Sequence, residues 1–331
     1  MNIKKQEKLF KEPEEQIIIL EEERNLTIDD KERAISLLTR INYYNLINGY
    51  KRPFLDHEKT REKNEDWYRD GVNLKDLYSL YKFDKNISGV IFPVILRIES
   101  EIKTILSSVI SSKTEDAHKD SVYLRLGFFD TDNLNNKRER ELLQLIERLN
   151  QYIDKEDCQP YIKHYKTEHK YVPLWVLTNA ITFGDMTLYY KYLTQKDKHS
   201  LVRTLEKSTR IDPNHFYYIL QMMRIYRNKL AHDETFYSYK ARNRKGYRYT
   251  VKFNGFNGIR TQETSVYTLI VSFKLILCEE DYDNFRELFL KFLLDLSKSI
   301  DEIAFKHVLN DMGFNDGHLK IESYDDVVKY I

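Results

Sequence analysis

LKDLYSLYKFDKNISGVIFPVILRIESEIKTI, residues 74–105, is the longest periodic stretch of the chain and the one that decides its fold. Apolar side chains recur in it every three or four residues, which places them on one face of an α-helix. Pro93 lies inside the stretch and predicts a kink. The face consists of Leu77, Leu80, Tyr81, Ile87, Val90, Ile91, Val94, Ile95, Ile98, Ile102 and Ile105.

The composition extends this prediction to the whole chain. Only 10 glycines and 6 prolines occur in 331 residues, fewer turn residues than a sheet-rich protein needs. An apolar content of 41% is enough for a substantial core. We therefore predict an all-α fold. Further helices are expected over 27–41, 137–152, 174–193 (two helices meeting at Gly184), 213–231, 264–278 and 282–304, with a polar loop over 55–72.

The order of these helices predicts three regions. Residues 1–72 form an N-terminal helical region, and residues 73–311 form the main helical domain. A basic loop or hairpin over 235–262 is inserted in that domain, and 312–331 is a C-terminal tail. No repeat or Gly/Ser-rich linker marks a boundary.

Charge and cysteine content restrict the possible functions. Fifty-three Lys and Arg against 52 Asp and Glu leave a net charge of +1, so a polyanionic partner has to be argued locally. Cys158 and Cys278 fit neither a metal site nor a disulfide framework. No stretch resembles a signal peptide or reaches the roughly 18 apolar residues of a membrane span. We expect a cytoplasmic protein without a membrane partner.

The main chemical candidate is Arg227-Asn228-Lys229-Leu230-Ala231-His232, at the end of the helix that Asp212-Pro213 is expected to start. On a helix, Arg224, Asn228 and His232 share one face, and Arg227 lies on the neighbouring face. This set suits RNA cleavage without a metal. In such a reaction His232 transfers a proton, Arg227 stabilises the phosphorane and Asn228 orients either group.

Simpler explanations of the same residues stay open. Arg227 would then pair with Asp233 or Glu234, and His232 would cap the helix end. An Arg-x4-His spacing also arises often by chance. Glu99 and Glu101 are further candidates for the site, although a carboxylate near Arg97 fits a surface ion pair equally well.

A basic segment follows this motif. Residues 235–262 hold seven cations and no acid, with Tyr237, Tyr239, Tyr247, Tyr249 and Phe253 interleaved. Cations bind phosphates and tyrosines stack on unpaired bases, so the segment predicts RNA binding, while a solvated surface loop is the alternative. The predicted RNA-binding residues are Arg224, Lys229, Lys240, Arg242, Arg244, Lys245, Tyr247 and Arg248.

Metal and cofactor sites have little support in the sequence. His57, His164 and His169 have no carboxylate or thiol at metal-ligand spacing. No glycine-rich phosphate loop occurs. We expect neither a metal site nor a cofactor.

Several longer blocks carry a family resemblance. INYYNLINGYKRPF (41–54), FDKNI (83–87), RIE (97–99) and PLWVLTNAITFGDMTLYYKYL (173–193) resemble successive motifs of bacterial abortive-infection proteins of the AbiD/AbiF type. Arg227 to His232 resembles the Arg-x4-His motif of HEPN-superfamily ribonucleases. The resemblance implies a HEPN-like helical core, phage defence and a structured noncoding RNA as partner. It also implies a homodimer, because only one copy of the motif keeps this family context.

Three hypotheses follow, in decreasing order of support. The first is a metal-independent ribonuclease toxin that an RNA holds in check until infection. The second is a non-catalytic RNA-binding module that forms a ribonucleoprotein. The third is a protein-binding defence factor, which leaves the basic, aromatic segment unexplained.

Overall fold

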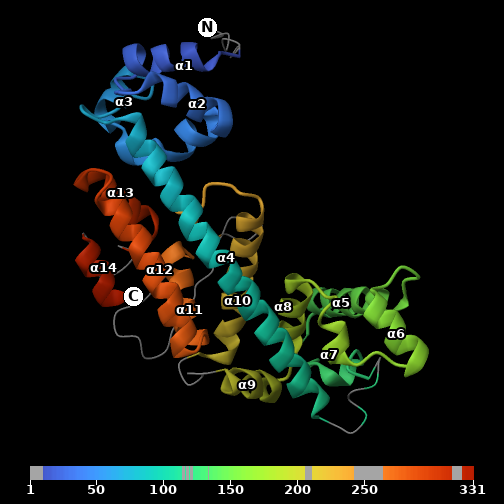
Figure 1. The fold of residues 1–331 in the computed structure, drawn as a ribbon. Coiled ribbons are helices and arrows are strands. Elements are labelled where there is room, and N and C mark those ends of the chain that lie inside the picture. The colour runs from blue at the N-terminus through green and yellow to red at the C-terminus, as the bar shows by residue number, and fades with distance from the viewer. Residues whose placement is uncertain are drawn as a thin grey trace.

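The protein is all-α, as predicted (Figure 1). In the parts that the computed structural model describes, the only β-type pairings are three isolated bridges, Thr27 with Asn73, Leu55 with Tyr68 and Phe129 with Leu193. The structure describes residues 10–113, 116, 119, 122–132, 134–205, 211–241, 264–314 and 323–331.

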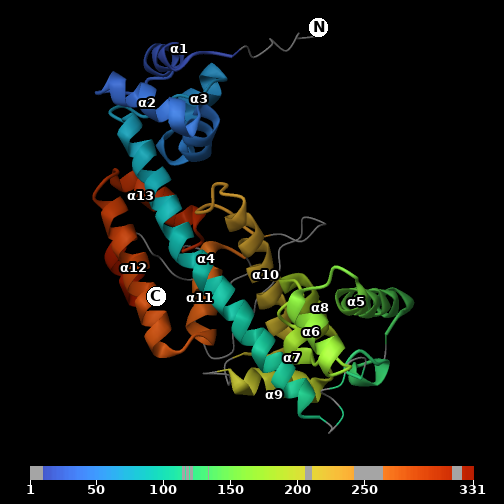
Figure 2. The same cartoon turned by 45° about the vertical axis from the view of Figure 1, so that its right-hand side comes forward.

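The predicted long helix is α4, Leu74–Ser111, which runs through most of the length of the molecule (Figures 1 and 2). Asn73 begins it with a capping box, in which Asn73 and Asp76 each accept a hydrogen bond from the other's backbone. The helix continues through Pro93. Its inward positions are fully buried, including Leu77, Leu80, Ile87, Ile91, Ile95, Ile98, Ile102 and Leu106.

The other core helices pack around α4. Helix α12, Glu279–Ser297, lies along it, and α10, Pro213–Ala231, contacts its other side (Figure 2). Helix α11, Val266–Ile276, packs against both α10 and α12, and ten of its eleven residues are buried. This arrangement brings residues from the middle of α4 next to the last turns of α10.

The N-terminal residues cover the first turns of α4 (Figure 1). The polar loop predicted over 55–72 was partly wrong, because Asp56 caps a short helix there. Arg69 joins this region to the C-terminal helices through two hydrogen bonds, at 3.0 and 2.9 Å, to the carboxylate of Asp301. The region comprises α1 (Pro13–Ile18), η1 (Ile19–Glu23), α2 (Lys31–Ile41), η2 (Tyr44–Asn48), η3 (Arg52–Phe54) and α3 (His57–Lys63).

The segment predicted as two helices meeting at Gly184 does form two helices, but they are separated earlier. Helix α7, Leu174–Leu177, ends before Thr178, and Thr182 caps α8, Phe183–Tyr192. Gly184 therefore lies in the first turn of α8. The neighbouring elements are η4 (Leu126–Phe128), α5 (Asn136–Asp154), α6 (Pro160–Glu168) and α9 (Gln195–Thr204).

The helix predicted over 282–304 is also divided. Helix α12 ends at Ser297, and α13, Glu302–Asp311, begins after Asp301, whose side chain accepts the backbone N–H of Ala304. The tail adds α14, Tyr324–Tyr330. In the described parts of the chain, no helix is both long and apolar enough to cross a membrane.

Candidate active site at the end of helix α10

Helix α10 forms as its sequence predicts. The side chain of Asp212 accepts the backbone N–H of Asn214, and Pro213 occupies the first helical position. The helix ends at Ala231, and His232 is its C-terminal cap. Apolar residues fix the orientation of the helix by packing into the core: Phe216, Ile219, Leu220, Met222, Met223 and Tyr226.

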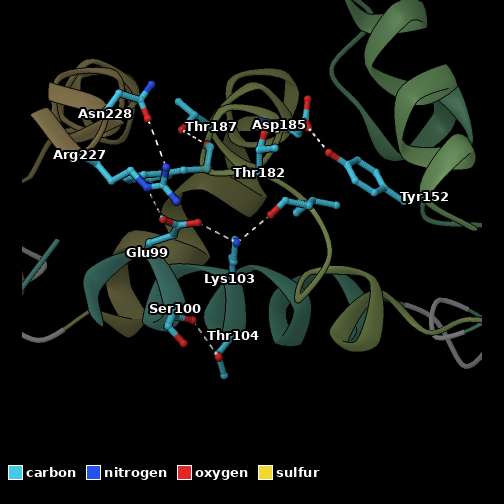
Figure 3. A network of polar contacts seen from close by, with 12 residues as sticks. Glu99, Ser100, Lys103, Thr104, Tyr152, Thr182, Asp185, Thr187, Arg227 and Asn228 are labelled. Atoms are coloured by element: carbon cyan, nitrogen blue, oxygen red, sulfur yellow. Dashed lines mark hydrogen bonds and ion pairs between the residues drawn. The ribbon is translucent and has the colours of Figure 1, made fainter. Parts of the chain in front are cut away.

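Arg227 lies at the boundary between this core and the surface. Its side chain is 40% exposed, and its Nε is 4.0 Å from Oε2 of Glu99 on α4. Glu99 is buried, with 8% of its surface exposed. Neither the Arg227 Nε nor the Glu99 Oε2 has a hydrogen-bond partner. The two groups face each other across the contact of α4 and α10 (Figure 3).

Lys103 holds the other side of Glu99. Its Nζ is 2.8 Å from Glu99 Oε1 and donates a second hydrogen bond, also 2.8 Å, to the carbonyl oxygen of Ile181. The buried carboxylate therefore lies between two cations, and the Lys103 contact also fixes the loop before α8 (Figure 3). Arg97, expected beside Glu99, instead pairs with Asp281 on α12.

Asn228 and His232 are both exposed on the last turns of α10. Asn228 Oδ1 accepts a hydrogen bond of 3.4 Å from Arg227 Nη1. The His232 backbone N–H donates to the carbonyl oxygen of Lys229 at 3.2 Å. The structure thus brings Asn228 to Arg227 and leaves the His232 imidazole on the surface at the helix end.

The other cations predicted near the motif have different neighbours. Arg224 donates hydrogen bonds of 2.9 and 3.3 Å to Gln221 on its own helix. Lys229 pairs with Glu234, and its Nζ lies 5.0 Å from the centre of the Tyr239 ring. These contacts hold both side chains against the protein.

Asp84 on α4 anchors the segment that follows the motif. Its carboxylate is fully buried and accepts the backbone N–H groups of Phe236 at 3.0 Å and Tyr237 at 2.6 Å. It also accepts the hydroxyl of Tyr50 at 2.7 Å. Burial raises the pKa of Asp84, while these hydrogen bonds act in the opposite direction.

The next residue of α4 fixes the turn at the end of α10. Lys85 Nζ donates hydrogen bonds of 2.7 Å to both the backbone oxygen and Oδ1 of Asp233. Asp233 has φ of 52°, a left-handed conformation that reverses the chain after His232. Asp233 therefore pairs with Lys85 and Glu234 with Lys229, rather than either of them with Arg227.

Sequence reasoning included Asp84 and Lys85 in the family-like block 83–87 but gave them no role, although one further signal was present. Asp84 occupies a position of the apolar face of α4, four residues after Leu80 and three before Ile87. A carboxylate at such a position has to be hydrogen-bonded, because leaving it unpaired costs several kcal/mol. The pattern could have predicted an internal anchor but not its partners, because Phe236 and Tyr237 lie 152 and 153 residues further along the chain and Tyr50 lies 34 residues earlier.

The structure describes only the beginning of the predicted basic insertion. Tyr237 is buried and stacks near Tyr50, with 6.1 Å between ring centres, so its ring is not available to an RNA base. Lys240 is partly buried. The other predicted RNA-binding residues, Arg242, Arg244, Lys245, Tyr247 and Arg248, lie outside the described residues.

Two family-like blocks and the segment after the Arg-x4-His motif therefore meet around one carboxylate: Tyr50 comes from the first block and Asp84 from the second. A family model described as Abi-like protein matches residues 36–238, which contain all three. The chain belongs to the Abi-like protein family. Membership supports a role in abortive infection. No match to the chain was found among curated proteins or solved structures.

The matched range of this Abi-like chain ends one residue after Tyr237 and includes Glu99, Lys103 and Arg227. Within the described residues, no group of three or more His, Cys, Asp or Glu side chains is arranged to hold a metal ion.

Proposed function

We propose that this Abi-like protein is an endoribonuclease of the HEPN type, which acts in abortive infection and needs no metal ion. One observation carries the proposal: the half-exposed guanidinium of Arg227 is held against the buried carboxylate of Glu99, shortly before the exposed His232 on the same helix. A fixed cation and, close to it in the chain, a side chain able to transfer a proton are what phosphodiester cleavage requires.

In the proposed reaction, the 2′-oxygen of the RNA attacks the adjacent phosphorus and the bond to the 5′-oxygen breaks. A proton leaves the 2′-hydroxyl and another reaches the departing oxygen, so the products are a 2′,3′-cyclic phosphate and a 5′-hydroxyl. His232 transfers one of these protons. Arg227 stabilises the additional negative charge on the phosphorane, and Asn228 orients the phosphate.

The Glu99–Lys103 pair supports the proposed role of Arg227 because it restricts the conformations of the Arg227 side chain. An arginine at the surface samples many rotamers, and its charge is well hydrated. Glu99 attracts the Nε side of the guanidinium, and its own burial is compensated by Lys103. The Nη groups are then directed away from the core, where one of them contacts Asn228. Glu99 is a positioning residue in this scheme.

The proposed partners are RNA and a second copy of the chain. A structured noncoding RNA would bind the basic segment that begins at Lys240, in a salt-dependent manner. A homodimer would place two copies of the motif together. The exposure of His232 and Asn228 supports this arrangement, since both side chains are open to a facing molecule.

A non-catalytic RNA-binding module is the second candidate. The cations of the segment 235–262 favour it, because they would bind phosphates whether or not the strand is cleaved. In that case the surface around α10 docks a structured RNA, and defence depends on another partner.

The test compares the purified wild type with His232→Ala and Arg227→Ala on single-stranded RNA in the presence of a chelator. His199→Ala, an exposed histidine on α9, is the matched control. We expect both motif variants to lose about 100-fold in cleavage rate, and DNA of the same sequence to be resistant. Equal cleavage by wild type and His232→Ala would refute the catalytic assignment. Copurified RNA with no cleavage by any variant would favour the second candidate.

A further inference from the structure

A polar pocket lies directly beside the candidate active site. Its volume is about 170 Å³, and its wall begins at Asp233, the residue after His232. Elements from both ends of the matched range form it: the end of α2, helix η2, the second turn of α4 and the segment after α10. The side chains that matter here are Arg40, Asn45, Tyr81, Lys85, Asp233 and Glu234.

The wall of the pocket carries as many positive as negative side chains. Arg40 and Lys85 carry positive charge, and Asp233 and Glu234 carry an equal negative charge. Within the described residues, the exposed side chains of Arg40 and Asn45 have no hydrogen bond or ion pair. A guanidinium and an amide are thus available to a ligand, and the amide both donates and accepts.

Two tyrosines with nearly perpendicular rings, at 85° to each other, contribute to the wall of the pocket. Tyr81 is partly exposed, and its ring meets the ring of buried Tyr50 edge to face, with centres 5.5 Å apart. Tyr50 is fixed from behind, because its hydroxyl donates to Asp84. A rigid aromatic wall beside unpaired polar groups suits a small, planar, polar ligand.

The volume and charge of the pocket restrict the class of ligand further. Pockets for drug-sized ligands enclose about 300–1,000 Å³, so this one is large enough only for a smaller group. Among the described residues, a free phosphate would meet one unpaired cation, Arg40, and would be repelled by the carboxylates of Asp233 and Glu234 in the same wall. A nucleobase is planar, uncharged and carries both donors and acceptors on its edge, which matches Asn45 and Arg40.

We propose that the pocket takes a single nucleobase of the RNA strand, from a nucleotide next to the phosphate that His232 faces, and so sets a base preference. This inference rests on the proposed function, because the RNA strand is assigned to the surface around His232. The same base could also arrive as a free nucleotide, so the experiment distinguishes the two sources.

In the first arm, the full-length His232→Ala variant retains RNA from a pool of random sequence, and the bound RNA is sequenced. Two pocket variants, Asn45→Ala and Arg40→Ala, are each combined with His232→Ala. The matched controls replace an exposed residue of the same type outside the pocket: Asn310→Ala on α13 and Arg140→Ala on α5. We expect one base to be enriched at a fixed position. Each pocket variant should reduce that enrichment about three- to tenfold, the effect of one lost hydrogen bond, and the controls should not.

In the second arm, the four free nucleosides compete with the bound RNA. Weak competition supports a base that is bound as part of the strand, whereas competition at the concentration of the RNA itself would assign the pocket to a free nucleotide and overturn the proposal. Absent base enrichment, or enrichment unchanged in both pocket variants, would also overturn it.

Cleavage by the wild type separates this inference from the proposed function. If the wild type cleaves RNA and the pocket variants do not change the base preference, the ribonuclease proposal stands and the pocket proposal is refuted. If base enrichment depends on Asn45 and Arg40 but the wild type does not cleave RNA, the pocket proposal stands and the catalytic proposal is refuted. If the chain neither retains nor cleaves RNA, both proposals fail.

Discussion

The carboxylate of Asp84 accepts the backbone N–H of Tyr237 at 2.6 Å, although 153 residues separate the two in sequence. This hydrogen bond, with those from Phe236 and Tyr50, ties the chain after the Arg-x4-His motif to the longest helix of the protein. The position of His232 relative to Arg227 is thereby fixed at both ends, by α10 on one side and by Asp84 and Lys85 on the other.

Replacement of Asp84 by Ala should destabilise the protein by about 2–5 kcal/mol, because two backbone N–H groups and a hydroxyl would be left buried without an acceptor. Urea unfolding followed by circular dichroism measures this change. Asp295→Ala, an exposed aspartate on α12, is the control and should change the free energy of unfolding by less than about 0.5 kcal/mol. Equal effects of the two substitutions would contradict the anchor.

Gly49→Ala should be destabilising although Gly49 has helical φ and ψ, where alanine is normally preferred. A Cβ at this position would lie 2.9 Å from Oγ1 of Thr235, so one of the two segments has to move. We expect a loss of about 1–2 kcal/mol. In a Thr235→Ala background the added methyl group has room, and the cost of Gly49→Ala should largely disappear. Additive effects in this double-mutant cycle, measured by chemical unfolding, would show that the contact has no consequence.

Glu99→Gln should lower the rate of RNA cleavage about tenfold, because Arg227 loses the charge that orients it. Lys103 would also lose its buried partner, so the protein should be less stable by about 1–3 kcal/mol. Glu101→Gln, on the same helix but exposed, is the matched control. Single-turnover cleavage with saturating protein separates the rate from the affinity. An unchanged rate for Glu99→Gln would remove Glu99 from the mechanism.

Stability should fall as the pH is lowered from 7.5 to 5.5, in part through His307. Burial lowers the pKa of His307 below 6.5, and His57, Arg69 and Arg52 act in the same direction, while Asp311 opposes them. A histidine with a depressed pKa in the folded state binds fewer protons than in the unfolded chain, so its contribution is present above pH 6.5 and is lost below it.

Thermal unfolding of His307→Gln at both pH values tests this assignment. The variant should show a smaller decrease in midpoint temperature between pH 7.5 and 5.5 than the wild type. His199→Gln, at an exposed position, should retain the wild-type pH dependence. A decrease in His307→Gln as large as in the wild type would exclude His307 as the source.

The helices that were predicted best are those whose evidence is local. The apolar period of 74–105 predicted α4, and Asp212-Pro213 with the pattern up to Ala231 predicted α10. In both, a single face of regularly spaced side chains meets the core, and neighbouring residues supply the cap. The predictions failed where a break depends on packing, as between α7 and α8, where the chain is continuously apolar and periodicity shows no end.

The residues of the candidate site could be predicted only in part from local sequence patterns. Arg227, Asn228 and His232 were identified from their spacing, and Glu99 was one of two acidic candidates on α4. Lys103 stands four residues after Glu99 on the same helix, so its spacing could have identified it. Arg227 could not be identified as a partner, because it reaches Glu99 from another helix, 128 residues later. Arg97 is nearer in sequence but points to α12.

The amino-acid sequence alone was enough to predict that the chain is helical, where α4 and α10 lie, and which residues form the motif at the end of α10. Those properties follow from side-chain periodicity and capping, which act over a few residues. Three features became visible only in the folded protein: Asp84 and Lys85 hold the turn after the motif, Glu99 faces Arg227, and a pocket opens beside Asp233. These contacts form between segments far apart in the chain, and their energies depend on burial that exists only once the helices have packed together.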